Sequence, residues 1–302
     1  MDIIFMGTPS YADEILKKVI DDPEINVVAV YTQPDKPVGR KKVLTPPPVK
    51  TTALEHNIDV YQPNRLRDEN VVEELQQIKC DYIVVAAYGQ ILPKAILQHA
   101  PCINLHASIL PQYRGASPIQ QTLLNGDRKT GVTAMLMDEG LDTGDIIKIS
   151  EITVADDEMV ATLFDRLTDV ASELTLDVLK NFEKYTPVKQ DDALSSHCAK
   201  ISKAEGEVSF DDAQKLYNKY RAFTPWPGIY LPSGLKLKQI NLVENSSTNQ
   251  AGEILEVKKE SIIAGCQKGS VEISLVQPKS KKEMSVIGYL NGQRIGVADT
   301  LS

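Results

Sequence analysis

The apolar positions in the first half of the chain form short continuous runs that alternate with amphipathic stretches. The run at residues 2–6 ends in a Gly-Thr-Pro turn, after which apolar residues recur at helical spacing from Tyr11 to Ile20. The same pattern predicts further strands at 25–31, near Val60, at 82–87 and at 102–106, and helices at 48–56, at 68–79, after Pro93 and from Pro118. Strands that alternate with helices and are apolar throughout are typical of a parallel, doubly wound α/β sheet.

Two further strands and one long helix complete this region of the chain. Residues 131–137 and 145–154 are strand-like apolar runs, and between residues 158 and 182 apolar positions recur every three or four residues. That spacing places them along one stripe of a helix. We therefore expect a long amphipathic helix over 158–182 that covers the sheet.

The pattern changes after Phe182. The next segment holds a proline and paired Asp and Ser residues, which predicts a linker. One helix is predicted at 212–222, and the short apolar runs that follow are separated by frequent turn residues, as in a small antiparallel barrel. The expected organisation is an N-terminal catalytic domain at 1–183, a linker at 184–205 and a C-terminal barrel at 206–302.

The composition of the 302-residue chain is that of a folded globular protein, with 42% hydrophobic and 25% charged residues. Its longest apolar stretch, Tyr82–Tyr88, is far shorter than the ~20 residues of a membrane-spanning helix, and the N-terminus lacks the basic start of a signal peptide. The four cysteines form no C-x-x-C pair, which argues against a zinc ribbon or a disulfide framework. We expect a cytoplasmic protein with reduced thiols and no membrane association.

The net charge of −8, taken alone, disfavours a nucleic-acid partner, because polyanions are bound chiefly through Lys and Arg. The charge is unevenly distributed: residues 1–205 carry 21 Lys and Arg against 31 Asp and Glu, whereas residues 206–302 carry 12 against 10. The stretch KPVGRKKVLTPPPVK, from Lys36 to Lys50, holds five basic residues and no acidic one, and its prolines predict an irregular, exposed loop. This loop is either a solvated surface feature or a contact for a polyanion.

Asn104 and His106 are the first candidates for catalysis. They end the predicted strand at 102–106, and the two-residue period of a strand points both side chains to the same face. Ligands of open α/β sheets bind at the carboxyl ends of the strands. An amide donor beside an imidazole is suited to stabilising an oxyanion and moving a proton in acyl transfer, although such a pair also occurs as an ordinary strand end.

The stretch GVTAMLMDEGLDTGD contributes three aspartates, Asp138, Asp142 and Asp145, around two glycines. A carboxylate from this turn is suited to orienting His106, holding it protonated or accepting the proton of an attacking amine, whereas aspartates in turns also cap their own backbone. Other site classes are disfavoured. A metal site lacks a spacing motif such as H-E-x-x-H, a nucleophilic serine lacks the G-x-S-x-G turn, and a dinucleotide site lacks further glycines after Gly7.

Two segments together carry a resemblance to a known family. NLHASILPQYRGASP (104–118) and GVTAMLMDEGLDTGDII (131–147) resemble the two signatures of the folate-dependent formyltransferases. MGTP, TQPDKPVGR, AAYGQILP, KISKAEGEVSF and RAFTPWPG extend the resemblance over essentially the whole chain, toward those members that act on methionyl-tRNA. It implies a Rossmann-like N-terminal domain and a C-terminal OB-like barrel. The implied reaction transfers the formyl group of 10-formyltetrahydrofolate to the α-amine of initiator methionyl-tRNA. We expect the chain to act as a monomer, without a metal.

The resemblance also implies roles for individual residues. The catalytic residues of the family correspond to Asn104, His106 and Asp142. Its folate-binding segment corresponds to Ser108, Ile109, Leu110 and Pro111, with Ile109 in place of a usual leucine. The residues implied to contact tRNA are basic and lie in the loop and the linker: Arg40, Lys41, Lys42, Lys200 and Lys203. The resemblance implies a basic linker, in which this sequence offers Lys200 and Lys203.

Three alternatives stay open. A formyltransferase of the same fold that acts on a nucleotide-linked amino sugar shares the signatures, but a small substrate needs no extended basic loop. A hydrolase that releases formate from the same folate differs in whether water or an amine attacks. The third alternative is a non-catalytic RNA-binding protein with an α/β domain. The presence of Asn104, His106 and Asp142 disfavours it, because binding alone does not use this set of residues. The destination of a labelled formyl group separates these functions.

Overall fold

The computed structural model describes residues 1–39 and 41–301, and the part of the chain that it describes forms two compact units. The first unit comprises residues 1–118, 129–153 and 164–198, and the second unit comprises residues 119–128, 154–163 and 199–302. The first unit therefore holds all three residues predicted to be catalytic.

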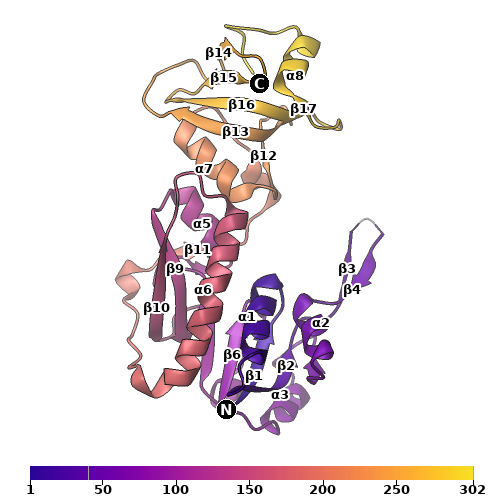
Figure 1. The fold of residues 1–302 in the computed structure, drawn as a ribbon, viewed down its shortest axis with the longest axis vertical. Coiled ribbons are helices and arrows are strands. Elements are labelled where there is room, and N and C mark those ends of the chain that lie inside the picture. The colour runs from indigo at the N-terminus through magenta and orange to yellow at the C-terminus, as the bar shows by residue number, and fades with distance from the viewer. Residues whose placement is uncertain (40, 302) are drawn as a thin grey trace. The chain divides into compact units, whose positions relative to one another are not determined.

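A seven-stranded sheet forms the centre of the first unit (Figure 1). Its strands are β1 (Asp2–Gly7), β2 (Asn26–Tyr31), β5 (Val60–Tyr61), β6 (Tyr82–Ala86), β7 (Cys102–His106), β9 (Lys129–Leu136) and β10 (Ile146–Thr153). The order is β10-β9-β7-β6-β1-β2-β5; the strands from β7 to β5 pair in parallel, and β9 and β10 pair antiparallel at one edge. The predicted mostly parallel sheet is confirmed.

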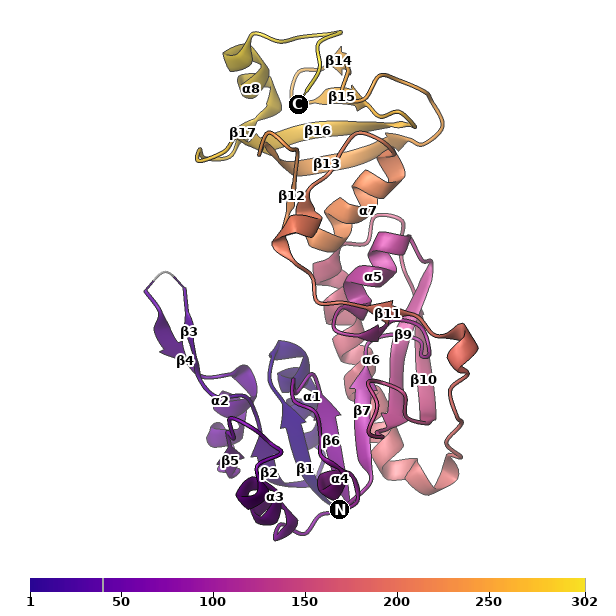
Figure 2. The same cartoon turned by 180° about the vertical axis from the view of Figure 1, so that it is seen from behind.

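Helices cover both faces of this sheet. They are α1 (Ser10–Ile20), α2 (Pro48–Glu55), α3 (Glu69–Gln76), α4 (Lys94–Leu97) and α6 (Val160–Asn181). Helix α5 (Pro118–Asn125) belongs mostly to the second unit. In two opposite views α1 and α6 lie on one face, and α3 and α4 lie on the other (Figure 1 and Figure 2). Because strand residues alternate between faces, Ile4 packs with Leu75 of α3 and Ile96 of α4, while Tyr11 of α1 meets Phe164 of α6 on the opposite side. This is the doubly wound arrangement.

The basic loop is more regular than the sequence predicts. Residues of β3 (Lys36–Val38) pair antiparallel with those of β4 (Val43–Thr45), so the expectation that prolines exclude regular structure here is wrong. Each strand of a two-stranded ribbon has one free edge, and Pro37 is tolerated there because its missing N–H is not needed for pairing. Gly39, with a φ of +72°, lies in the turn between the strands.

The start of the predicted linker is part of the first unit. After α6 the chain forms two short 3₁₀ turns, η1 (Phe182–Lys184) and η2 (Asp192–Leu194), and then the strand β11 (His197–Cys198). Strand β11 pairs in parallel with β8 (Arg114–Gly115), which lies in the loop after β7. Residues 184–198 are therefore bonded to the loop that follows the predicted catalytic strand.

The second unit is built around an antiparallel sheet, as predicted. Its strands are β12 (Ile229–Tyr230), β13 (Lys236–Glu244), β14 (Ile254–Val257), β15 (Ile262–Gly265), β16 (Ser270–Gln277) and β17 (Met284–Ser285), and its helical elements include η3 (Lys203–Gly206), α7 (Ala213–Phe223) and α8 (Val286–Gln293). Helix α7 begins at an N-cap aspartate, Asp212, whose carboxylate accepts from the Lys215 N–H. Leu216 and Phe223 on this helix are buried.

Candidate active site

Asn104 and His106 lie at the carboxyl end of β7, near the middle of the sheet. Parallel pairing with β6 and antiparallel pairing with β9 fix the strand on both sides: Asn104 is opposite Val85 and Met135, and His106 is opposite Thr133. Both side chains are largely buried, at 9% and 6% exposure. The position that the strand pattern predicts for this pair is therefore the position that the structure gives it.

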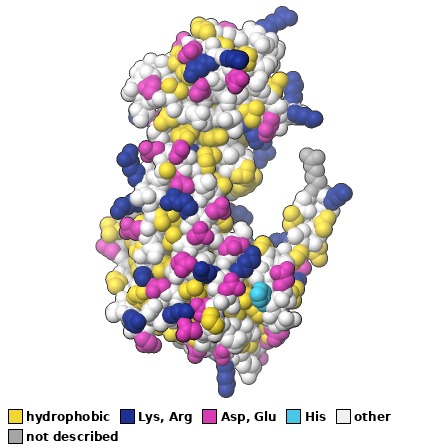
Figure 3. Space-filling model, in the orientation of Figure 1, with side chains coloured by type: hydrophobic (Ala, Val, Ile, Leu, Met, Phe, Trp, Pro, Cys, Tyr) yellow, Lys and Arg dark blue, Asp and Glu magenta, His cyan; other side chains and the backbone are white. Residues whose placement is uncertain are grey.

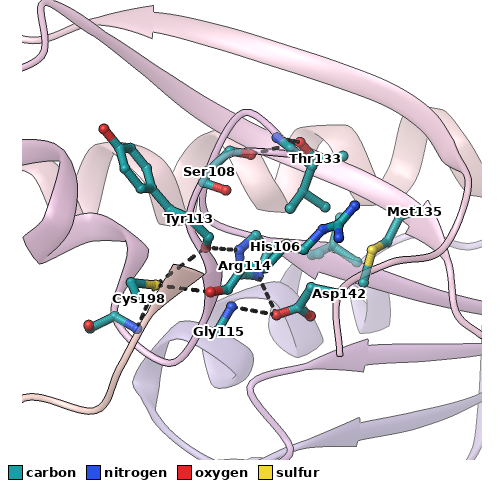
Figure 4. A network of polar contacts seen from close by, with 12 residues as sticks. His106, Ser108, Tyr113, Arg114, Gly115, Thr133, Met135, Asp142 and Cys198 are labelled. Atoms are coloured by element: carbon teal, nitrogen blue, oxygen red, sulfur yellow. Dashed lines mark hydrogen bonds and ion pairs between the residues drawn. The ribbon is translucent and has the colours of Figure 1, made fainter. Parts of the chain in front are cut away.

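The two nitrogens of the His106 ring have different environments. Nε2 lies 2.9 Å from the carbonyl oxygen of Tyr113, and because a carbonyl only accepts, Nε2 carries a hydrogen. Nδ1 lies 3.7 Å from Oδ2 of Asp142, which is too long for a direct hydrogen bond (Figure 4). Nδ1 is consequently the nitrogen that is able to take up and release a proton, and a carboxylate faces it.

Asp142 reaches the histidine from the turn between β9 and β10. Its φ is +54°, a left-handed conformation, and its Oδ2 accepts the backbone N–H of Gly115 at 2.8 Å. Gly144 is required in this turn, since a Cβ atom there would lie 1.7 Å from the carbonyl oxygen of Leu136. Asp138 has a different role, because its Oδ1 accepts from the Gly140 N–H and from the Thr143 hydroxyl and so caps the turn.

The loop after β7 contributes three residues that sequence reasoning did not assign. Tyr113, with a φ of +59°, supplies the carbonyl that fixes the His106 ring, and Gly115 supplies the N–H that holds Asp142. Arg114 between them is only 4% exposed. The signal in the sequence was weak: the three residues stand inside the quoted segment 104–118, but nothing in that segment says where a backbone carbonyl points.

The predicted folate-binding segment forms the first part of the same loop. The Ser108 hydroxyl donates to the carbonyl oxygen of Gln112 at 2.6 Å, and Thr133 donates to the Ser108 carbonyl and accepts from the Leu110 N–H. Ser108 and Leu110 are buried, whereas Ile109 and Pro111 are partly exposed. We expect a ligand at this segment to contact its backbone and the side chains of Ile109 and Pro111, because the Ser108 hydroxyl already donates to Gln112.

The residues predicted to contact tRNA lie in both units. Lys41 and Lys42 are exposed in the β3–β4 hairpin, while Arg40 lies outside the described residues. Lys200 and Lys203 are exposed in the second unit. The described candidates are therefore divided between the two units.

The surface of the hairpin combines basic and apolar side chains (Figure 3). Val38, Val43 and Leu44 are 56–65% exposed. At the hairpin base, Lys50 pairs with Asp35 at 2.9 Å, and hydrogen bonds from Gln62 and Lys50 lower the pKa of the Asp35 carboxyl. Lys50 is therefore an internal partner of the hairpin, in contrast to Lys41 and Lys42.

Among residues 1–39 and 41–301, the cysteines, the possible metal ligands and the helices were the other places where a functional feature could lie. Burial raises the pKa of Cys102 and of Cys266 to about 12, so neither thiol is a ready nucleophile. The described residues contain no group of three or more His, Cys, Asp or Glu side chains placed to hold a metal ion. None of the described helices is both long and apolar enough to cross a membrane.

Known proteins share both the sequence and the fold. A formyl transferase family model matches residues 1–179, and a formyl transferase C-terminal domain model matches residues 200–294. A methionyl-tRNA formyltransferase from Sulfurimonas denitrificans is 67% identical over 100% of both chains, and one from Nitratiruptor sp. is 55% identical over 99% of both. The solved structure of an N-formyltransferase from Helicobacter canadensis, in complex with folinic acid and dTDP-3-aminofucose, shares the fold with a TM-score of 0.70 at 18% identity, over 91% of this chain and 99% of that chain. The resemblance of the sequence signatures is confirmed, and this chain belongs to the methionyl-tRNA formyltransferase family of formyl transferases.

Proposed function

We propose that the chain transfers the formyl group of 10-formyltetrahydrofolate to the α-amine of initiator methionyl-tRNA, which gives N-formylmethionyl-tRNA for translation initiation. Full-length relatives at 67% and 55% identity carry the name of this activity. The observation that carries the chemistry is the catalytic cluster, by which we mean Asn104 and His106 at the carboxyl end of β7 together with Asp142 from the turn between β9 and β10. Amide, imidazole and carboxylate together are suited to acyl transfer between two nitrogens, because they supply an oxyanion donor and a proton carrier with a charged partner.

His106 is proposed to move the proton through Nδ1. The attacking amine forms a bond to the formyl carbon and must lose a proton, and the leaving nitrogen of the folate must gain one as its bond to that carbon breaks. Because Nε2 is held by the Tyr113 carbonyl, Nδ1 is the atom that accepts the proton from the attacking amine and then donates a proton to the leaving nitrogen of the folate. While Nδ1 and Nε2 are both protonated, the ring is positively charged, and the Asp142 carboxylate 3.7 Å from Nδ1 interacts favourably with that charge.

Asn104 is proposed to stabilise the oxyanion of the tetrahedral intermediate. Its side chain lies on the same face of β7 as His106, and the flanking strands fix it in place. A donor that is already positioned needs no reorganisation when charge develops, and its loss costs about 10²–10³ in rate in well-studied cases. Neither residue needs to form a covalent bond to the substrate.

Recognition of the tRNA is proposed to use exposed basic residues that are not part of this cluster. Lys41, Lys42 and the neighbouring Arg40 are the candidates in the β3–β4 hairpin, Lys200 and Lys203 are candidates in the second unit, and residues 206–302 carry a slight excess of basic charge. Each Lys or Arg that neutralises a phosphate releases counterions, so binding should weaken as salt increases. We place the reaction in the cytoplasm, where the protein acts as a monomer.

A transfer assay with a labelled formyl group tests this proposal. The purified chain is mixed with 10-formyltetrahydrofolate labelled in the formyl carbon and with either charged initiator tRNA, uncharged tRNA or a nucleotide-linked amino sugar. We expect the label on the methionine of charged tRNA alone, recoverable as N-formylmethionine after the ester bond is hydrolysed. Transfer to the amino sugar, or release as free formate without transfer to tRNA, would overturn the assignment.

A further inference from the structure

Gln190 lies in the segment between η1 and β11, outside every sequence signature that points to formyl transfer. It is only 6% exposed although its side chain is polar. We propose that Gln190 is a positioning residue for Asp142, which it holds at the working distance from His106. This inference rests on the proposed function, because it assigns Gln190 a part in that transfer reaction.

All four hydrogen-bonding positions of the Gln190 amide are used. Nε2 donates to the carbonyl oxygens of Asp142 at 2.9 Å and Gly144 at 2.8 Å. Oε1 accepts from Nε and Nη2 of Arg114 at 3.0 Å and 2.8 Å. A glutamine amide has two donors and two acceptor sites, so this side chain is fully satisfied in its buried position.

These bonds join the two chain segments that meet at His106. Asp142 and Gly144 belong to the turn between β9 and β10. Arg114 belongs to the loop after β7, where it lies between Tyr113, whose carbonyl fixes Nε2 of His106, and Gly115, whose N–H donates to Oδ2 of Asp142. The Gln190 amide therefore bonds to the backbone and the side chain beside these groups, and it acts on His106 and on Oδ2 through their supports. Figure 4 shows His106 between its two partners, the Tyr113 carbonyl and the Asp142 carboxylate, and the Gly115 N–H bonded to that carboxylate.

The conformation of Asp142 gives a reason for this support. A residue other than glycine at a φ of +54° is strained and persists only when its surroundings hold it. The Asp142 carboxylate has one bond to the Gly115 N–H, and its backbone carbonyl has the bond from Gln190. Without the amide donors, the turn is free to relax and the carboxylate to move away from Nδ1. A displacement of about 1 Å of a positioned group is enough to cost ~10²-fold in rate.

Gln190→Glu is the sharpest variant, because it keeps the shape and the two acceptor positions that Arg114 needs. It removes both donors and places a carboxylate oxygen against the Asp142 and Gly144 carbonyls. Gln190→Met removes all four bonds at similar volume and serves as the second variant. Asp192→Asn is the matched control: Asp192 is an exposed neighbour that pairs with Arg114 at 2.9 Å but makes none of the bonds to the Asp142 turn.

Cys198 reports whether the segment stays in place. Its thiol lies against the Tyr113 and Arg114 carbonyls at 3.3 and 3.5 Å, it is 5% exposed, and burial raises its pKa. It should therefore resist alkylation as long as β11 stays paired with β8. Slow alkylation of Cys198 in a variant means that the fold around the site is intact.

The experiment measures formyl transfer to methionyl-tRNA by the full chain, with kcat and both KM values, together with alkylation of Cys198. For Gln190→Glu we expect a kcat that is about 10–100-fold lower, KM values within about threefold of wild type and unchanged protection of Cys198. Asp192→Asn should stay within twofold of wild type. If the wild-type chain transfers no formyl group, the proposed function fails. If the wild type is active and Gln190→Glu either keeps its kcat or loses Cys198 protection together with activity, the positioning role is wrong.

Discussion

The catalytic cluster and the β3–β4 hairpin both belong to the first unit, yet they are built in opposite ways. Asn104 and His106 are at most 9% exposed, and the His106 ring is bonded to the backbone of the loop after β7. On the hairpin, Lys41 and Lys42 are exposed, and apolar side chains such as Leu44 face solvent. Chemistry needs groups that are held in place before the substrate arrives, whereas binding to a polyanion needs charge that it can reach. Damage to the two regions should therefore change different kinetic constants.

The largest effects should come from truncation of the two strand residues. His106→Ala removes the proton carrier, and Asn104→Ala removes the proposed oxyanion donor, so kcat should fall by about 10³-fold and about 10²–10³-fold respectively. Binding of tRNA should not change, which a filter-binding titration measures. His56→Ala, at an exposed position beyond α2, is the matched control and should keep full activity. Near-normal turnover of either strand variant would show that the roles are misassigned.

Asp142→Asn should have the next largest effect. The amide keeps an oxygen that can accept from the Gly115 N–H, but it removes the negative charge 3.7 Å from Nδ1 of His106. Because the charged ring loses its favourable partner, we expect kcat to fall by about 10²-fold with the KM for tRNA unchanged. Initial rates over a range of tRNA concentrations measure both constants. A rise in KM with an unchanged kcat would instead place Asp142 in substrate binding.

Removal of two hairpin charges should act on binding alone. In the double variant Lys41→Ala/Lys42→Ala we expect the KM for tRNA to rise about tenfold while kcat stays the same. The slope of log affinity against log salt should become shallower by about one for each phosphate contact that is lost. Lys79→Ala, exposed just before β6 at the other end of the strands, is the control and should leave the slope as it is. An unchanged slope in the double variant would rule out the hairpin as a phosphate contact.

The smallest effect should follow loss of the contact at the hairpin base. Gln62 and Lys50 lower the pKa of Asp35, so their stabilising interaction is present above the ordinary carboxyl pKa and is lost as the pH falls through the lowered value, below about pH 4. Asp35→Asn should have the same effect at neutral pH: faster amide exchange in β3 and β4 and a KM for tRNA that rises about twofold. Exchange rates equal to wild type in the variant would mean that this contact does not hold the hairpin.

The same contrast explains what the sequence predicts and what it does not. Strand period and position were enough to place Asn104 and His106 together, because neighbouring residues on one strand have a fixed geometry. The hairpin at 36–45 was missed because prolines are read as breakers, although the edge of a two-stranded ribbon accepts them. Gln190 lies 48 positions from Asp142 in the chain, and no local pattern encodes a contact across that separation.

One measurement tests the separation of chemistry from binding most directly: the single-turnover rate constant of formyl transfer as a function of tRNA concentration. It compares the wild type with His106→Ala and with Lys41→Ala/Lys42→Ala. We expect the hairpin variant to reach the wild-type rate constant at saturating tRNA, and His106→Ala to stay about 10³-fold below it at every concentration. A hairpin variant whose saturated rate constant is as low as that of His106→Ala would contradict the account.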